Sequence, residues 1–251
     1  MAADRRLDLP VVDLASSDLR AAAKSIRQAC VEYGFFYVTN HGIDASLMER
    51  VFAESRKFFE LPMEEKMALR KNSSHRGYTA PYSEKVDPLL ESRGDSKESF
   101  YIGPTGGDLQ IDVNLWPSGE RFPSWKETMQ MYHANALDTG KRILSLIALS
   151  LDLDADFFHK NGAFETPSAF LRLLHYSERK IVIHRCGKTF ITLMGLLLLT
   201  LVAFFIDPSP NLVVECMESC CSEANPPRFP PIKSGDYLEE RLSSTYKVAT
   251  V

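Results

Sequence analysis

The spacing of apolar residues predicts regular elements from the start of the chain. Residues 9–14 (LPVVDL) form a short apolar run that predicts a β-strand. Asp18 then precedes apolar residues at helical spacing, so we expect a helix that this side chain caps and that Gly34 ends. The segment 35–42 (FFYVTNHG) predicts a second, buried strand that runs into a turn. Asp44 is the expected cap of a second amphipathic helix.

Proline and glycine divide the next part of the chain. A proline at the first helical position predicts a short helix over 62–70 (PMEEKMALR). Residues 72–122 are polar and contain many turn-forming residues. We interpret them as a long excursion that holds a few strands, with 97–104 (KESFYIGP) among them.

The longest helical pattern follows this excursion. Ser124 and Glu127 form an S-x-x-E capping box in front of it. Apolar residues line one face of the helix, which is typical of packing against a core. His133 lies on this stripe, and we interpret it as a core histidine with satisfied hydrogen bonds rather than a metal ligand. Residues 168–176 (SAFLRLLHY) then predict a strand.

The pattern changes after Tyr176. A basic stretch leads into residues 189–206, which carry no charge, and a polar, proline-rich tail follows. As a helix, this run would be about 27 Å long, close to the roughly 30 Å hydrocarbon core of a membrane. Preceding basic residues would then keep the N-terminal part in the cytosol. The alternatives are the buried wall of a sheet, or a segment foreign to the fold around it.

Length and charge limit the number of domains and the kinds of partner that this chain can have. The 251 residues suffice for one large domain or two small ones. The net charge of −4 and the pI of about 5.9 give no basic excess, so nucleic acid is not an expected partner. The first ten residues lack the apolar core of a signal peptide. We therefore expect a cytoplasmic protein, the alternative being a single-pass membrane protein anchored by 189–206.

The cysteines do not indicate a disulfide framework or a metal site. Their number is odd and their spacing irregular, so we expect reduced thiols in a cytosolic chain. A structural zinc site usually needs four ligands, often in two spaced pairs, and no second pair or nearby histidine is present. The cysteines are Cys30, Cys186, Cys216, Cys220 and Cys221.

Several motifs occur in a specific order. They are PVVDL (10–14), GFFYVTNHGI (34–43), FFELPMEEK (58–66), RGY (76–78) and LRLLHY (171–176). In this order they resemble the non-haem iron(II), 2-oxoglutarate-dependent dioxygenases of the isopenicillin N synthase-like, plant type. The tail over 203–211 and 220–246 is similar to the end of the same proteins.

This resemblance implies an α+β fold, in which an N-terminal α/β region and a long helix back a double-stranded β-helix, or jelly roll. LRLLHY is similar to the first barrel strand and 203–208 (AFFIDP) to the last, while the strands between them are missing. We therefore expect an incomplete barrel, from a truncated or alternatively spliced chain or a faulty gene model. The expected divisions are 9–122 as the dioxygenase N-terminal domain, 123–176 as long helix and first strand, 177–202 as a non-family insert, and 203–246 as the barrel remnant.

The family's iron ligands have no counterpart in this chain. The resemblance implies a ferrous site of two histidines and one carboxylate, two of them written as H-x-D. None of the six histidines is followed two residues later by Asp or Glu. The family also holds the distal carboxylate of 2-oxoglutarate with an R-x-S motif, and the corresponding positions here are Leu199 and Leu201. We therefore expect no iron and no 2-oxoglutarate to be bound in the family's manner, and no catalytic residues.

Tyr176 is the one candidate that matches a cofactor-binding position. The resemblance gives this tyrosine a contact with 2-oxoglutarate, and the alternative is an aromatic residue that merely ends a strand. Two improvised metal pairs, His175 with Glu178 and His184 with Cys186, lack a third ligand, and we interpret them as coincidence. For His41, in the turn of 35–42, we expect hydrogen bonds to local backbone.

The expected function follows from the resemblance and its gaps. Complete relatives use Fe(II) and 2-oxoglutarate to oxidise a small organic substrate, whereas this chain is expected to be catalytically incompetent. The alternative is a remnant without enzymatic activity, anchored in a membrane or acting only through interactions. Missing strands would leave apolar faces and strand edges exposed, so a membrane, a chaperone or another chain is an expected partner.

Overall fold

The computed structural model describes residues 9–84, 94–104, 113–165, 168–176 and 199–246. The helices are α1 (Leu19–Glu32), α2 (Ala45–Phe59), α3 (Met63–Met67), α4 (Trp125–Ser150), α5 (Phe157–Lys160) and α6 (Ser234–Tyr246), with a 3-10 turn η1 (Glu218–Cys220). The strands are β1 (Val11–Asp13), β2 (Tyr37–Thr39), β3 (Gly77–Thr79), β4 (Lys97–Ile102), β5 (Ser168–Tyr176), β6 (Leu199–Asp207), β7 (Val213–Val214) and β8 (Ile232–Lys233). The fold is therefore α+β, as expected.

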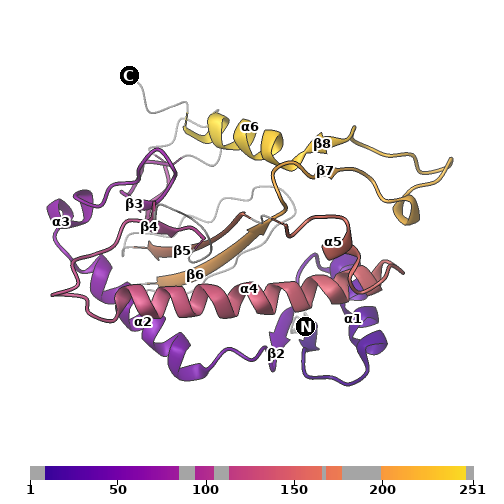
Figure 1. The fold of residues 1–251 in the computed structure, drawn as a ribbon, viewed down its shortest axis with the longest axis horizontal. Coiled ribbons are helices and arrows are strands. Elements are labelled where there is room, and N and C mark those ends of the chain that lie inside the picture. The colour runs from indigo at the N-terminus through magenta and orange to yellow at the C-terminus, as the bar shows by residue number, and fades with distance from the viewer. Residues whose placement is uncertain (1–8, 85–93, 105–112, 166–167, 177–198, 247–251) are drawn as a thin grey trace, which may run out of the picture.

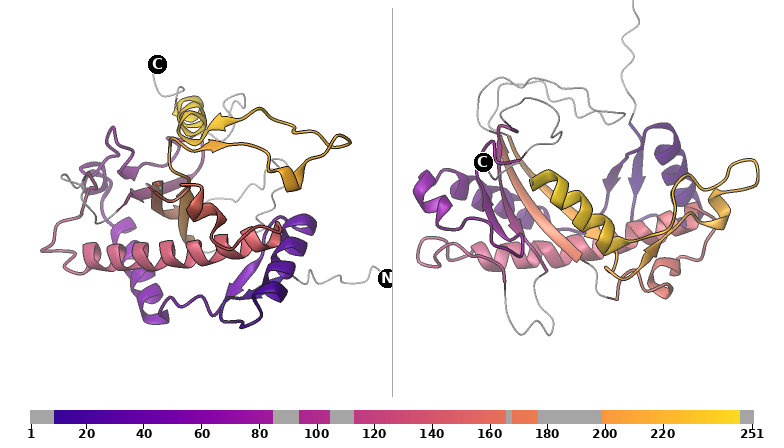
Figure 2. Two further views of the ribbon diagram at one scale, coloured as in Figure 1. Left: turned by 45° about the vertical axis from the view of Figure 1, so that its right-hand side comes forward. Right: turned by 90° about the horizontal axis from the view of Figure 1, so that it is seen from above.

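The long helix α4 runs along one side of the main sheet, and α6 with the β7–β8 pair lies on the other (Figures 1 and 2). Along its length α4 contacts α1, α2, β5 and β6. The N-terminal helices therefore pack on α4, and α4 and α2 together cover one face of the sheet.

The N-terminal helices begin where their caps predict. The Asp18 carboxylate accepts a hydrogen bond from the Ala21 amide at 2.9 Å, and Asp44 accepts one from the Leu47 amide at 3.2 Å. Gly34 follows α1 with a φ of +82°, a conformation that glycine adopts without strain. The prediction of a buried second strand is wrong: β2 pairs in parallel with β1 only, and Tyr37 remains 57% exposed.

Two predicted helix starts differ in detail. Pro62 has a φ of −52° and a ψ of 146°, so it lies just before α3 rather than at its first position. The predicted capping box is also wrong, because Ser124 makes no side-chain cap hydrogen bond. Its backbone is already helical, with a φ of −97° and a ψ of −9°, whereas a capping side chain needs an extended backbone.

The main sheet has four antiparallel strands in the order β3-β4-β5-β6. β5 occupies the predicted residues 168–176, and it pairs with β6 from Ser168 opposite Asp207 to Tyr176 opposite Leu199. β3 and β4, which come from the excursion over 72–122, extend the sheet on the other edge of β5. β6 also begins at Leu199, four residues before the expected boundary at 203.

The strand β6 shows that part of the uncharged run over 189–206 is not helical. Residues 199–206 pair along their whole length with β5, so the run over 189–206 is not a single helix. Residues 189–198 lie outside the described part of the chain. Within the described part, no helix is both long and apolar enough to span a bilayer.

An aromatic core joins the sheet to α2 and α4. Phe58 lies at its centre, with ring centroids 4.8 Å from Phe100, 5.2 Å from Trp125 and 5.4 Å from Phe59. Leucines of β5 pack on the same cluster from the sheet side. A smaller cluster joins β1 and α1 to the far end of α4. The sheet therefore depends on α2 and α4 for its apolar cover.

We predict that Phe58→Ala lowers the free energy of unfolding by about 3–5 kcal/mol, because it leaves a cavity at the centre of the aromatic core. Phe229, which is 81% exposed, provides the control, and Phe229→Ala should change stability by less than about 0.5 kcal/mol. Urea unfolding followed by tryptophan fluorescence measures both. Equal effects of the two substitutions would contradict the assignment of this core.

Candidate functional site

The two faces of the main sheet carry different kinds of residue. Phe100 and Ile102 of β4 belong to the aromatic core, so they face α2 and α4. Side chains alternate along a strand, which puts Lys97, Ser99 and Tyr101 on the opposite side, here called the distal face. The register between β4 and β5 extends the distal face to Arg172, Leu174 and Tyr176.

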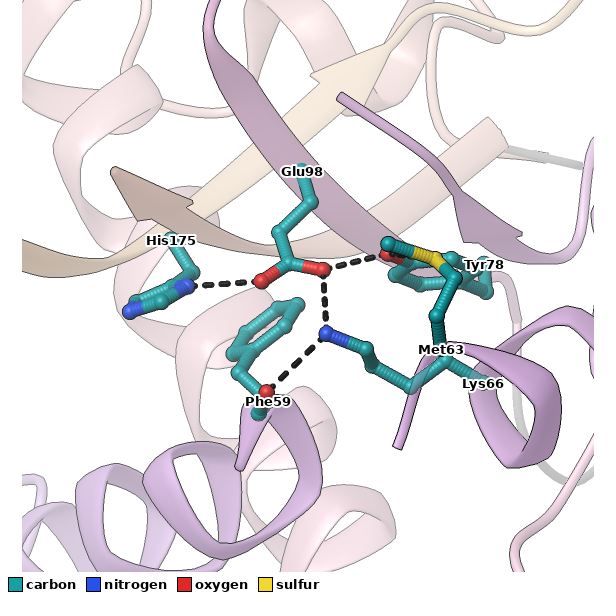
Figure 3. Close-up of polar contacts among 6 residues, drawn as sticks. All are labelled: Phe59, Met63, Lys66, Tyr78, Glu98 and His175. Atoms are coloured by element: carbon teal, nitrogen blue, oxygen red, sulfur yellow. Dashed lines mark hydrogen bonds and ion pairs between the residues drawn. The ribbon is translucent and has the colours of Figure 1, made fainter. Parts of the chain in front are cut away.

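On the helix side, a buried carboxylate gathers donors from several elements (Figure 3). Glu98 of β4 accepts from Lys66 Nζ of α3 at 2.8 Å, from the Tyr78 hydroxyl of β3, and from His175 Nδ1 of β5 at 2.7 Å. Lys66 Nζ also donates to the Phe59 carbonyl, at the end of α2, at 3.0 Å. We call these residues the Glu98 cluster.

Burial dominates the electrostatics of the Glu98 cluster. The side chains of Lys66 and Glu98 are each 7% exposed. Burial alone would raise the pKa of Glu98, but hydrogen bonds from His175, Lys66 and Tyr78 lower it below its usual value. Burial and the bond to Glu98 raise the pKa of Tyr78, so it remains a phenol donor. The cluster is a buried ion pair whose carboxylate accepts from three side chains at once.

Three histidines that drew attention in the sequence have structural partners. The His175 ring donates through Nδ1 to Glu98 and stacks on Phe59 at 5.2 Å, on the helix side of the sheet. His133 is 3% exposed and its Nε2 lies 3.1 Å from the Ala169 carbonyl, which confirms the interpretation of a core histidine. His41 Nδ1 accepts from the Ile43 amide at 3.0 Å, the expected local bond. The other members of the two possible metal pairs, Glu178, His184 and Cys186, lie outside the described residues.

The distal face carries a second charged cluster, built around Glu84. Its carboxylate pairs with Arg172, lies 3.4 Å from Lys97 Nζ and accepts from the Tyr101 hydroxyl at 3.1 Å. Arg172 also donates to Ser99 Oγ at 3.2 Å, and its guanidinium lies 4.5 Å from the centre of the Tyr101 ring. The Nε atom of Arg172 is buried without a hydrogen-bond partner. This distal cluster is a carboxylate-binding arrangement that an internal carboxylate already occupies.

Lys71 adjoins the distal cluster, with its Nζ 5.4 Å from the centre of the Tyr101 ring. Burial lowers the pKa of Lys71 to about 8, while Glu84 acts in the opposite sense and Arg172 adds to the decrease. The amine is therefore mostly charged at neutral pH. It adds to the positive charge of Arg172 and Lys97 on this face.

Tyr176 and Leu201, two of the positions to which the resemblance gives cofactor roles, lie at one end of the distal face. Tyr176 is half-buried and pairs with Leu199, while Leu174 pairs with Leu201. The leucine at 201 offers no charge to a carboxylate. The contact of Tyr176 with 2-oxoglutarate stays a prediction.

Among the residues that the structure describes, no set of donors fits a ferrous centre of the expected type. Such a centre needs two histidines and a carboxylate that converge on one point. Across the ranges that the structure describes, no three His, Cys, Asp or Glu side chains converge in this way. His175, which lies nearest to Tyr176 in the chain, is on the helix side of the sheet and bound to Glu98.

The arrangement of helices and sheet defines the class of protein. It is similar to a full-length Neurospora crassa protein solved in complex with alpha-KG, with a TM-score of 0.76 and 22% identity. That similarity covers 94% of this chain and 96% of the other. The fold is therefore that of the 2-oxoglutarate oxygenases, as a partial jelly roll.

Sequence comparisons then establish the family. The family described as non-haem dioxygenase in morphine synthesis N-terminal matches residues 9–119. The chain is 32% identical to Kihadalactone A synthase LFS of Citrus sinensis over 306 aligned positions, covering 94% of this chain and 91% of that protein. It is 25% identical to the 2-oxoglutarate-Fe(II) type oxidoreductase hxnY of Emericella nidulans, covering 94% and 90%. This chain belongs to the non-haem, Fe(II)- and 2-oxoglutarate-dependent dioxygenases.

Sequence reasoning missed both charged clusters, although a signal was present for one of them. Lys66, Tyr78 and His175 lie in FFELPMEEK, RGY and LRLLHY, three of the motifs that carry the family resemblance. Glu98 lies in the predicted strand 97–104. The histidine at the end of the apolar run in LRLLHY was the signal, because a polar group that is buried usually has a partner.

We predict that Glu98→Gln lowers the free energy of unfolding at neutral pH by about 3 kcal/mol, because it leaves the buried Lys66 charge without its counterion. The control is Glu65→Gln, which removes an ion pair to Arg121 whose side chains are 45% and 53% exposed. Its effect should lie within about 1 kcal/mol. Denaturant unfolding measures both changes.

The same pair of variants tests pH dependence. The pKa of Glu98 is lowered by folding, so its contribution is present above the ordinary glutamate pKa and is lost as the pH falls through the folded pKa. The stability difference between the wild type and Glu98→Gln should therefore shrink on acidification below about pH 5. A difference that does not change with pH would show that Glu98 is not ionised in the folded protein.

Proposed function

We propose that this chain is a catalytically inactive member of the dioxygenase family, with the family's fold but without its ferrous centre. The observation that carries the proposal is that none of its six histidines belongs to an H-x-D or H-x-E tripeptide. The hydrogen bond between His175 and Glu98 supports the proposal, because the Nδ1 atom of His175 is then not available as a metal ligand. Leucine at position 201 supports it further.

The proposal includes an internal deletion as the cause. The alignment with the Citrus sinensis protein runs over 306 positions, more than the 251 residues of this chain, so that protein has residues for which this chain has none. The resemblance locates the gap between β5 and β6, which pair directly here. We propose 9–122, 123–176, 177–202 and 203–246 as its divisions, with the strand β6 crossing the last boundary.

The proposal names a class of substrate for complete relatives and a cellular location for this chain. The Neurospora crassa protein has also been solved with alpha-KG and thymine, which supports a small organic molecule as the substrate class of complete relatives. For this chain we propose a cytoplasmic location. When bound in a complete relative, iron and 2-oxoglutarate supply oxidation by oxygen. Because the sequence lacks the H-x-D motif, the proposal contains no catalytic step.

We predict that anaerobic titration with Fe(II) and 2-oxoglutarate produces no stoichiometric metal-to-ligand charge-transfer band. Succinate should not form when oxygen is admitted, because the ligand set is incomplete. A complete family member provides the positive control. A stoichiometric band together with succinate release would overturn the proposal.

The Tyr176→Phe variant tests the remaining cofactor assignment separately. Binding of 2-oxoglutarate without metal is followed by ligand-observed NMR. If Tyr176 is only a strand-end aromatic, the wild type and variant should give the same weak response. Binding that is lost in Tyr176→Phe would assign the tyrosine its family role, even without turnover.

We predict that sequencing the transcript across codons 176–203 recovers the reading frame of the present sequence, with no H-x-D codons between β5 and β6. A continuous frame that encodes H-x-D and further barrel strands would instead show that the deletion belongs to the gene model. That result would refute the inactive-member proposal for the cellular protein.

A further inference from the structure

Three cysteines lie close together in the connection between β7 and β8. Cys216 is exposed, Cys221 is half-buried, and the turn η1 separates them. The turn brings both thiols to one backbone oxygen. Cys216 Sγ and Cys221 Sγ donate to the Met217 carbonyl at 3.8 Å and 3.4 Å. Two sulfurs that share one acceptor are already near each other.

We propose that Cys216 and Cys221 form a redox-active dithiol, which a hydroperoxide converts to an intramolecular disulfide. This assignment is independent of the proposed function, because it uses none of the residues of either charged cluster. In a reducing compartment such a disulfide forms transiently and is reversed by thiols.

The third cysteine, Cys220, is a poorer partner for Cys221. Cys220 and Cys221 are adjacent, and adjacent Cα atoms lie about 3.8 Å apart, below the roughly 4.4–6.8 Å that disulfides usually span. Cys220 Sγ instead lies 3.9 Å from Ser219 Oγ. The pairing of Cys216 with Cys221 encloses the η1 turn and avoids the strain of the adjacent pair.

An oxidant has access to Cys216, which is exposed. Cys216 and Cys220 line an apolar cavity of about 790 Å³ between the end of β6, the β7–β8 connection and α6, and this cavity opens to solvent. Desolvation and then the neighbouring thiol of Cys221 raise the pKa of Cys216. Because thiolate is the reactive form, oxidation should accelerate as the pH rises.

The reaction balances with one molecule of hydrogen peroxide. One thiolate sulfur attacks a peroxide oxygen, the S–O bond forms, the O–O bond breaks, and hydroxide leaves, which becomes water by taking up the proton that the thiol had released. The second thiol sulfur then attacks this sulfenic acid, the S–S bond forms, the S–O bond breaks, and a second water leaves with the remaining proton. Two thiols lose two electrons in total, and the peroxide gains them.

The test treats the reduced full-length protein with hydrogen peroxide, alkylates the remaining thiols under denaturing conditions, and maps the cysteines by mass spectrometry. The expected product is a monomer that has lost two hydrogens, with Cys216 and Cys221 protected from alkylation. Dithiothreitol should restore both thiols. The rate should increase between neutral and mildly alkaline pH.

Matched variants identify the pair. Cys216→Ser and Cys221→Ser should each abolish the protected pair, while Cys220→Ser and Cys30→Ser should retain it. Should a serine variant fail to fold, the alanine variant at the same position takes its place. Protection of any other pair, a disulfide between chains, oxidation to sulfinic acid alone, or no loss of thiols would each overturn the proposal.

Discussion

The ion pair between Glu98 and Lys66 is the constraint on which the rest of the sheet depends. A carboxylate that is 7% exposed is tolerable only with strong partners, and this one takes donors from α3, β3 and β5 at once. Because Lys66 also binds the last turn of α2, the same group ties that helix to β4. Phe59 stacks on His175 of the Glu98 cluster and also contacts Phe58 of the aromatic core. The polar and apolar parts of the interior are therefore in direct contact.

One face of the sheet packs against the helices, and the other carries charged and polar residues. The helix side is well packed: its apolar residues are covered by α2 and α4, and His133 and His175 have partners there. The distal face holds the positions to which the resemblance assigns cofactor contacts, and it also carries Leu201 and the Arg172–Glu84 pair. Family membership therefore rests on the scaffold and the sequence, because a fold alone does not determine the chemistry of its site.

Local signals predicted local structure well. Aspartates at 18 and 44 marked two helix starts, and the strand over 168–176 was predicted to the residue, because caps and apolar runs act within a few positions. Failures appeared where the backbone conformation or the strand pairing differed from what the local pattern predicts. Ser124 has the right neighbours for a capping box but a helical backbone, and β2 is apolar yet has only β1 as a partner. The extent of β6 was underestimated because its limit is set by pairing with β5.

The sequence by itself determined the order of elements, the family and the lack of an H-x-D motif, since each of these is written in neighbouring residues. Only the tertiary structure decided which face each side chain occupies and which charges meet. Glu98 bonds to residues 32, 20 and 77 positions away in the chain, and the sulfurs of Cys216 and Cys221 converge only through the turn η1. Ion pairs between distant residues leave no periodic trace, so their partners emerge only when strand register and helix packing bring them together.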